Sequence, residues 1–263
     1  MFPEFSVFNR TIGTYGLIAI IGLLVCGAVA CKLGKKYNIC IEDIILIMIS
    51  IGIGLVLGGH LLYAITNFDN VITVISHIGE KPIGIIFQEL AVCFGGSVFY
   101  GGFIGAVIAV FIHTKFSKSI KREQVLDIFA ISIPLFHVFG RIGCALGGCC
   151  YGIESEFGYT IYNNYLLPEV NGVNRFPVQL TEAAINLIIF LILLFMYKRN
   201  RMQEKLIYCY MIMYPIARFI LEFLRGDIIR GIWFGLSTSQ WISIILFVFA
   251  ISKLIYFKRE KMA

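Results

Sequence analysis

Long apolar stretches alternate with short polar or charged connections along the whole chain. Seven stretches are each close to the roughly 20 residues that a helix needs to cross about 30 Å of hydrocarbon. They cover residues 14–31, 43–65, 91–113, 126–147, 178–197, 206–222 and 235–256. The pattern predicts an all-α, polytopic membrane protein with seven transmembrane helices, in which residues 1–263 form a single integral membrane domain.

Lysine and arginine residues gather on alternate connections. Residues 32–36, 115–122, 198–205 and 253–261 hold fifteen of the 22 basic residues. The other seven are Arg10, Lys81, Arg141, Arg175, Arg218, Arg225 and Arg230. Because cytosolic loops of membrane proteins are enriched in basic residues, we expect the N-terminus outside and the C-terminus in the cytosol.

Composition supports a membrane location and narrows the partners. The chain is 59% hydrophobic and 14% charged, with a mean hydropathy of +0.85, which excludes a soluble domain of this length. The net charge of +6 is explained by the cytosolic clusters and by contact with membrane lipids, so it calls for no nucleic acid. Six of the seven basic residues expected on the outer side are arginines, which suit the recognition of phosphate or carboxylate.

The longest polar connection, at about 148–177, is predicted to be extracytoplasmic. It is rich in asparagine, glycine and proline, which favour turns. Such a segment is long enough to form a lid or a short hairpin over a site in the outer leaflet. An inert connection is the alternative interpretation.

Arg141 lies in the apolar stretch FGRIGCALGGCCYG, residues 139–152, directly after Gly140. A buried arginine usually has a partner or faces a water-filled cavity, because its charge is costly in hydrocarbon. The alternative is that the side chain extends to the headgroup layer.

A second polar group lies in YPIARFILEFLRGD, residues 214–227. Arg218, Glu222 and Arg225 follow at intervals of four and three, which places them on one face of a helix. Tyr214 lies one turn earlier and Asp227 lies just beyond. The set is either a structural ion-pair ladder or, since two arginines flank one glutamate, a positively charged site for an anion.

Two further candidates are less specific. Gln179 and Glu182 lie in the first turns of a helix that begins near Pro177, where a carboxylate is also favoured by the helix dipole alone. Tyr100 precedes Gly101 and Gly102 in a glycine-rich segment. This segment either packs helices closely, with the tyrosine as an interfacial anchor, or leaves the backbone open to a ligand.

Three of the eight cysteines, Cys144, Cys149 and Cys150, lie close together in the sequence. We expect them to line the cavity as small apolar residues, with a disulfide or a reactive thiol as the alternatives. Their spacing does not predict a metal site, and no cofactor is expected.

The order of these motifs, GGxxxY, FxGGFIG, GRIG-x8-G, FPxQLxE and YxxxRFxxExxRxD, resembles the prolipoprotein diacylglyceryl transferase family over nearly the whole chain. The resemblance implies a bacterial enzyme of the cytoplasmic (inner) membrane. It would transfer the diacylglyceryl group of phosphatidylglycerol to the lipobox cysteine thiol of a prolipoprotein and release glycerol phosphate.

The resemblance also implies roles for the candidate residues. The catalytic residues implied are Tyr100, Arg141, Arg218 and Glu222. The substrate-binding residues implied are Gly101, Gly102, Gly140, Gln179, Glu182, Tyr214, Arg225 and Asp227. Arg141 and Arg218 would together hold the lipid phosphate, and Tyr100 or Glu222 would take the proton of the acceptor.

The chain departs from the family pattern at several polar positions. Cys144 and Gly147 stand where the family has asparagines, and Cys149 stands where it has a glutamate. Tyr100 and Phe176 replace two histidines of the family pattern. These departures leave two alternatives: a phospholipid-dependent transferase with a different acceptor, and a lipid-binding membrane protein without catalytic activity.

Overall fold

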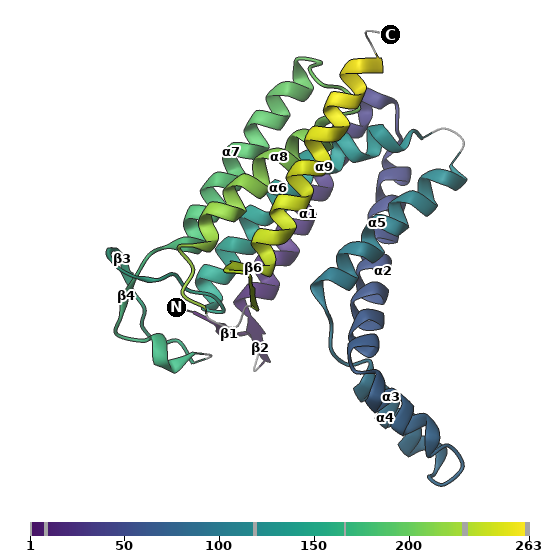
Figure 1. Cartoon of the computed structure of the whole chain (residues 1–263), viewed down its shortest axis with the longest axis vertical. Helices are drawn as coiled ribbons and strands as arrows, with labels where there is room; N and C mark the ends of the chain where they lie inside the picture. The colour runs from purple at the N-terminus through teal and green to yellow at the C-terminus, as the bar shows by residue number, and fades with distance from the viewer. Residues whose placement is uncertain (1, 8–9, 118–119, 166, 228–230, 261–263) are drawn as a thin grey trace. The chain divides into compact units, whose positions relative to one another are not determined.

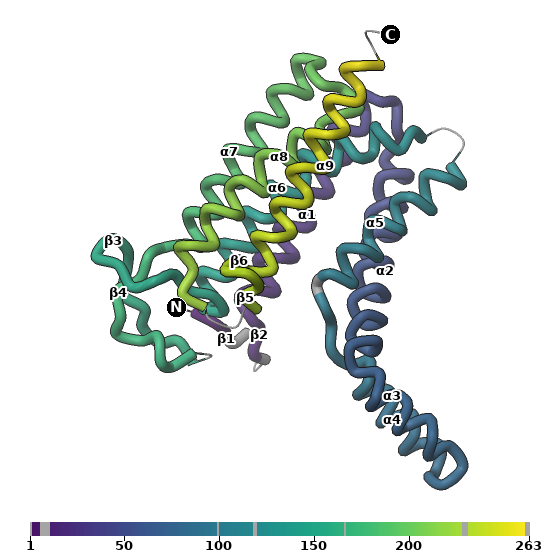
Figure 2. The backbone as a smooth tube through the Cα atoms, in the orientation of Figure 1, coloured from purple at the N-terminus to yellow at the C-terminus, as the bar shows by residue number. Residues whose placement is uncertain are grey.

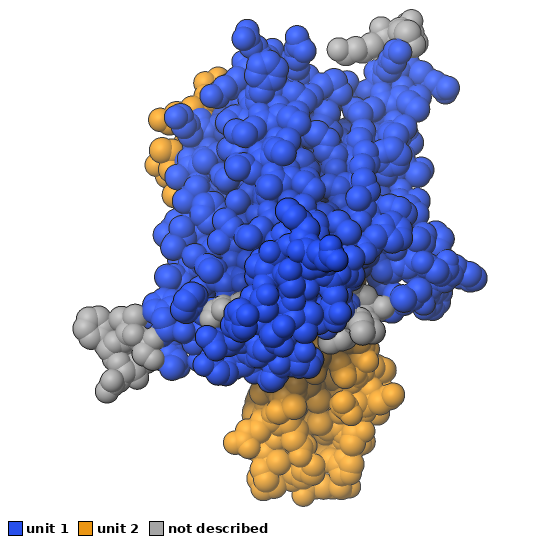
Figure 3. All heavy atoms as spheres, turned by 90° about the vertical axis from the view of Figure 1, so that its left-hand side faces the viewer, with its two compact units in different colours: residues 1–33, 123–263 blue, residues 34–122 orange. Residues whose placement is uncertain are grey.

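Helices make up most of the chain, as the apolar pattern predicts, and short pairs of strands lie between some of them (Figure 1). The computed structural model describes residues 2–7, 10–117, 120–165, 167–227 and 231–260. Lys118, Arg230 and Lys261, which contribute to the charge pattern, lie outside the described residues. The chain divides into unit 1, residues 1–33 and 123–263, and unit 2, residues 34–122 (Figure 3).

Unit 1 is built on long apolar helices. They are α1 (Thr14–Gly34), α6 (Arg122–Gly147), α7 (Val178–Lys198), α8 (Leu206–Glu222) and α9 (Thr238–Glu260). Helix α8 packs against both α7 and α9 (Figure 2). Helices α1 and α6 touch where Gly22 faces Phe139, since a methyl group at Gly22 would lie 2.7 Å from the Phe139 side chain.

A buried carboxylate fixes the start of α8. Both oxygens of Asp127 on α6 accept main-chain hydrogen bonds, from Glu204 N at 2.6 Å and from Leu206 N at 2.8 Å. The first N–H groups of a helix have no partner within it, and the helix dipole favours a negative charge there. Asp127 therefore joins the end of the connection between α7 and α8 to helix α6. This contact lies at the end of unit 1 that is away from the strand pairs.

Unit 2 contains η1 (Lys35–Tyr37), α2 (Ile41–Thr66), α3 (Phe68–Ser76), α4 (Ile83–Cys93) and α5 (Phe99–Phe116). Helices α2 and α5 lie in close contact through glycines. A methyl group at Gly54 would collide with the carbonyl oxygen of Gly105, and one at Gly58 with that of Gly101. The glycines of this segment therefore serve helix packing, which was one of the two interpretations of the sequence.

Among the described residues, five helical segments are long and apolar enough to cross a membrane. They are Thr14–Tyr37, Ile41–Thr66, Arg122–Gly147, Val178–Lys198 and Thr238–Glu260. The stretch 91–113 is not one continuous helix, because Gly95 and Gly96 follow the end of α4 and a new helix starts at Phe99. Helix α8 has only 17 residues. The prediction of seven spans is thus not confirmed, and the orientation of the termini stays a prediction.

Short antiparallel strands lie at one end of the unit 1 helices. Strand β1 (Glu4–Val7) pairs with β2 (Arg10–Gly13), and β5 (Ile232–Trp233) pairs with β6 (Leu236–Ser237). In the connection at about 148–177, β3 (Glu154–Thr160) pairs with β4 (Asn174–Arg175), and η2 (Pro168–Val170) lies between them. This connection therefore contains the hairpin that its turn-forming residues predict.

Candidate functional site

The ends of three helices of unit 1 bring charged side chains together. Arg141 comes from the last turns of α6 and Glu182 from the second turn of α7. The Arg141 Nε atom lies 3.0 Å from Glu182 Oε2, and the Glu182 side chain is only 1% exposed. Arg141 thus has the buried partner that an arginine in an apolar segment requires.

Arg225 does not lie on the face of α8, so the predicted helical ladder of three residues is wrong beyond Glu222. Helix α8 ends at Glu222, and the following segment pairs with the residues after α6. Gly226 N donates to Tyr151 O at 3.0 Å, and Ile153 N donates to Leu224 O at 3.1 Å. These long-range hydrogen bonds turn the chain out of the helical path.

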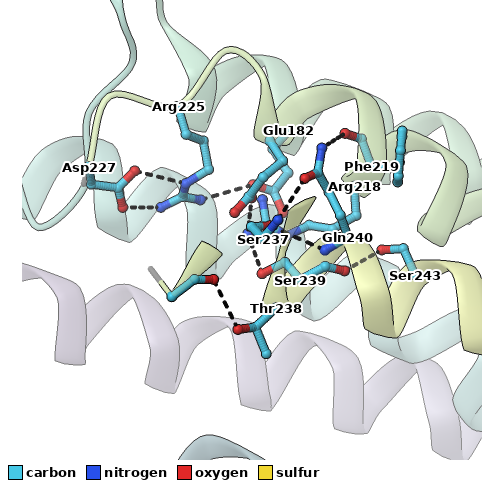
Figure 4. Close-up of polar contacts among 12 residues, drawn as sticks. Glu182, Arg218, Phe219, Arg225, Asp227, Ser237, Thr238, Ser239, Gln240 and Ser243 are labelled. Carbon is cyan, nitrogen blue, oxygen red and sulfur yellow. Dashed lines mark hydrogen bonds and ion pairs between the residues drawn. The ribbon is translucent and has the colours of Figure 1, made fainter. Parts of the chain in front are cut away.

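Arg225 instead lies between two carboxylates, as Figure 4 shows. Its Nε and Nη2 atoms bind Asp227 in a bidentate pair, at 3.0 Å and 2.6 Å, and its Nη1 atom lies 3.8 Å from Glu182 Oε2. Burial lowers the pKa of Arg225, but the hydrogen bond and the charge of Asp227 raise the pKa more, so it lies above its ordinary value. Glu182 therefore joins Arg225 to Arg141.

Arg218 has a buried nitrogen that the described residues leave without a hydrogen-bond partner. Its Nη2 atom lies 2.7 Å from Glu222 Oε2 and donates a hydrogen bond of 3.2 Å to Ser239 Oγ on α9. Its Nη1 atom is buried and has no hydrogen-bond partner among the described residues. A buried donor without a partner costs about 1–3 kcal/mol, so a ligand that accepts this hydrogen bond is favoured.

The charges within this group balance. The guanidinium groups of Arg141, Arg218 and Arg225 face the carboxylates of Glu182, Glu222 and Asp227. The prediction of a surplus positive charge, made from two arginines around one glutamate, is therefore wrong for these six side chains. Glu182 on α7 and Asp227 after α8 supply the further carboxylates. An anion would be bound by directed donors rather than by surplus charge.

Aromatic and polar side chains surround Glu182. Tyr214 donates a long hydrogen bond of 3.4 Å to Glu182 Oε1 and stacks on Tyr210. The sequence interpretation missed His137, whose ring lies 5.0 Å from that of Tyr214, and Asn186, whose amide donates to Glu182 O at 2.8 Å. Helical spacing was the available signal, because His137 precedes Arg141 by four residues and Asn186 follows Glu182 by four.

Gln179 and the glycines shape the surroundings of the arginines. Gln179 donates a side-chain hydrogen bond to Cys150 O, so it holds the connection after α6 against α7. A methyl group at Gly140 would meet no atom within 4 Å, which leaves open space beside Arg141. At Gly152, in contrast, a methyl group would collide with Phe176 O. Of these two glycines, Gly152 is the one that close backbone packing requires.

Three candidates belong to unit 2. Tyr100, Gly101 and Gly102 lie near the start of α5, and Tyr100 is 39% exposed. Gly101 contacts the backbone of α2, as described above, and a methyl group at Gly102 would lie 3.0 Å from Leu55 O. The structure thus brings together the candidates of unit 1 and leaves the role of these three as a prediction.

Comparisons with known proteins agree on one family. The family model described as prolipoprotein diacylglyceryl transferase matches residues 4–256. A phosphatidylglycerol–prolipoprotein diacylglyceryl transferase of Clostridium tetani is 34% identical over 252 residues, which cover 94% of each chain. A protein of Clostridium perfringens with the same name and the number 2 is 32% identical over 92% of this chain and 90% of its own. One of Campylobacter lari is 30% identical over 98% and 93%.

Proposed function

The chain belongs to the prolipoprotein diacylglyceryl transferase family, and we propose that it transfers the diacylglyceryl group of phosphatidylglycerol to the lipobox cysteine thiol of a prolipoprotein. The names of its relatives support both substrates, since each of the three is called a phosphatidylglycerol–prolipoprotein diacylglyceryl transferase. The match extends along almost the whole of each chain, so the chain is a transferase.

The unused Nη1 donor of Arg218 is the observation that carries the proposal for the site. A phosphodiester oxygen of the lipid accepts from this atom, and Arg141, with its side chain 23% exposed, binds the same phosphate from α6. Arginine suits this task because its planar guanidinium group can bind a neighbouring carboxylate with one nitrogen and donate to the phosphate with another.

The reaction forms one bond and breaks one. The sulfur of the acceptor cysteine attacks the glycerol carbon that is esterified to phosphate, and a C–S bond forms as the C–O bond breaks. Glycerol phosphate leaves with the electron pair of that bond, and the thiol proton passes to a base. Arg141 and Arg218 stabilise the charge that develops on the leaving phosphate. Electrostatic stabilisation of this kind is usually the largest single term in catalysis.

Glu182 and Asp227 act as positioning residues. Glu182 contacts both Arg141 and Arg225 through its Oε2 atom, and Asp227 holds Arg225 by a bidentate pair. Fixing the guanidinium planes before the substrate arrives reduces the reorganisation needed during the reaction. Tyr214, Gln179 and Gly140 complete the proposed substrate site through the contacts described above.

The base that takes the acceptor proton has two candidates, Tyr100 and Glu222. Glu222 already accepts a hydrogen bond from Arg218 at 2.7 Å, and protonation would weaken this pair just as the phosphate leaves. Tyr100 is the other candidate, and a phenol is in general a weak base at neutral pH. We assign the role to Tyr100, as the resemblance to the family implies.

We place the enzyme in the cytoplasmic membrane as a single integral domain of seven spans, with its N-terminus and the 148–177 connection outside. The charge pattern supports this orientation. Beyond the five longest helices, α8 supplies one of the two remaining spans, and α4 with α5 supplies the other. The phosphate site then lies near the outer leaflet, where the lipobox of a translocated prolipoprotein is accessible.

Lipid transfer to a peptide tests the proposed function. The full-length protein in detergent is incubated with phosphatidylglycerol labelled in its acyl chains and with a lipobox peptide, and we expect a thioether-linked diacylglyceryl peptide. A matched peptide with serine in place of the lipobox cysteine gives no product.

The departures from the family pattern at Cys144, Cys149 and Tyr100 favour a second candidate, a related transferase with another acceptor. Transfer of label to a different nucleophile, with none to the lipobox peptide, would establish that function instead.

A further inference from the structure

Three cysteine thiols converge at the end of α6. The sulfur atoms of Cys144, Cys149 and Cys150 all lie within 4.8 Å of one another. Cys144 is buried, Cys150 is half-buried and Cys149 is exposed, and all three are free thiols. We propose that these thiolates bind one thiophilic metal ion, Zn²⁺ or Cu⁺, with ligands distinct from the phosphate-binding arginines. The proposal does not depend on the transferase function.

The backbone after α6 places the thiols without help from an ion. Gly148 adopts a φ of 73°, and its N–H donates to Cys144 O at 2.9 Å, so the helix ends in a left-handed turn. This turn reverses the chain and returns Cys149 and Cys150 to Cys144. The close approach of the three thiols therefore follows from the helix ending.

Two buried amides hold the turn in place. Asn164 donates from Nδ2 to Gly148 O at 2.9 Å and is 1% exposed. Gln179, 2% exposed, donates to Cys150 O from the first turn of α7. The carbonyl groups on both sides of Cys149 are thus fixed by side chains from elsewhere in unit 1. A prearranged set of ligands loses little conformational entropy when it binds an ion.

The spacing of the sulfur atoms suits a shared metal ion. Two thiolates on one tetrahedral Zn²⁺ lie about 3.8 Å apart when each Zn–S bond is about 2.3 Å. Sulfur atoms within 4.8 Å therefore reach this arrangement through small rotations of the side chains. A disulfide would use two of the thiols and leave the third beside it, whereas one ion uses all three.

The chemistry of the donors selects the class of ion. Thiolates bind Zn²⁺ and Cu⁺ in preference to Mg²⁺ or Ca²⁺, which require oxygen ligands. Three sulfurs complete a trigonal Cu⁺ site, and on Zn²⁺ they leave a fourth position for water. The ion would tie the end of α6 to the connection that carries β3 and β4.

Metal titration of the full-length protein tests the site. The protein is purified in detergent under anaerobic, reducing conditions, stripped with a chelator, and titrated with Zn²⁺ or Cu⁺ against a chromophoric competitor. We expect one ion per chain, and Co²⁺ in place of Zn²⁺ should give a thiolate-to-metal charge-transfer band. Cys149→Ser should weaken metal binding by at least about 100-fold, because losing even a residue that only hydrogen-bonds a metal ligand weakens binding about 10- to 100-fold. Cys209→Ser, outside the cluster on α8, is the matched control.

Alkylation provides a readout that separates binding from folding. Bound Zn²⁺ or Cu⁺ should protect Cys144, Cys149 and Cys150 from iodoacetamide, as read by peptide mass spectrometry, and leave Cys40 reactive. Because Cys149 is exposed, Cys149→Ser should fold even if Cys144→Ser does not. Binding by Cys149→Ser as tight as that of the unaltered protein would overturn the proposal. A metal affinity of the unaltered protein no higher than that of the triple serine variant would also overturn it. The same holds for a disulfide between two of the three thiols that forms in the presence of the metal.

Discussion

Replacing Arg218 with lysine separates the two tasks of its guanidinium group. Nη2 binds Glu222 at 2.7 Å and Ser239 at 3.2 Å, whereas Nη1 is buried and available to the lipid phosphate. The lysine ammonium is a single charged centre that cannot extend in both directions from one position. In Arg218→Lys the ammonium group is therefore expected to stay with Glu222, which preserves the fold and removes the phosphate donor.

The expected loss follows from one charge-assisted contact. A donor aimed at charge that develops in the transition state contributes roughly 2–4 kcal/mol in a water-poor site. Arg218 is 8% exposed, so solvent compensates little for its removal. The corresponding decrease in kcat/KM is about 30- to 1,000-fold. Arg141→Lys should lose activity to a similar extent, since its Nε atom is already engaged by Glu182 at 3.0 Å.

The assay is transfer of labelled diacylglyceryl to a lipobox peptide, with folding checked by thermal unfolding in detergent. Arg201→Lys is the matched control, because Arg201 is exposed in the turn between α7 and α8. We expect the control to keep full activity. If Arg218→Lys folds and retains activity within about threefold of the unaltered protein, the argument from the unused donor is refuted.

Three further predictions concern positioning, packing and topology. Glu182→Gln should lower both transfer activity and the unfolding temperature, because breaking a buried ion pair costs about 3–5 kcal/mol. Gly152→Ala should destabilise the protein by about 1–3 kcal/mol through collision with a main-chain carbonyl, and Gly140→Ala, which faces open space, should not. In a cysteine-free chain in intact cells, an impermeant thiol reagent should label Thr160→Cys and leave Lys36→Cys unlabelled.

Each of these predictions has a result that contradicts it. Unchanged melting and turnover in Glu182→Gln would show that the carboxylate does not hold the arginines. Equal unfolding temperatures for Gly152→Ala and Gly140→Ala would refute the argument that Gly152 is needed for close packing in the connection that carries β3 and β4. Labelling at position 36 without labelling at position 160 would reverse the proposed orientation of the chain.

The local pattern of the sequence predicted the helices better than it predicted where they end. Apolar stretches correspond to α1, α2, α6, α7 and α9, because burying or embedding such stretches requires helical hydrogen bonding. The gap between α4 and α5 was less apparent, since Gly95 and Gly96 lie within an otherwise apolar run. Glycine pairs in such runs mark either close packing or a helix break, and periodicity does not distinguish the two.

Long-range contacts explain what local reasoning missed in the site. The i, i+4 spacing correctly paired Arg218 with Glu222, whereas Arg225 left the helical path through hydrogen bonds to residues 151–153, more than seventy positions earlier. The partnership of Arg141 with Glu182 joins two helices in the same way. The convergence of the cysteines depends on the left-handed turn at Gly148, and their spacing alone did not reveal it.

The stoichiometry of a single turnover tests the central claim most directly. Enzyme in excess over labelled phosphatidylglycerol is mixed with lipobox peptide, and mass spectrometry measures both the thioether-linked peptide and the released glycerol phosphate. The proposed reaction gives one glycerol phosphate for each lipidated peptide. If the arginines hold the phosphate as it leaves, both products fall together in Arg218→Lys. Glycerol phosphate released without thioether product, or lipidated peptide formed at an unchanged rate by Arg218→Lys, would contradict the account.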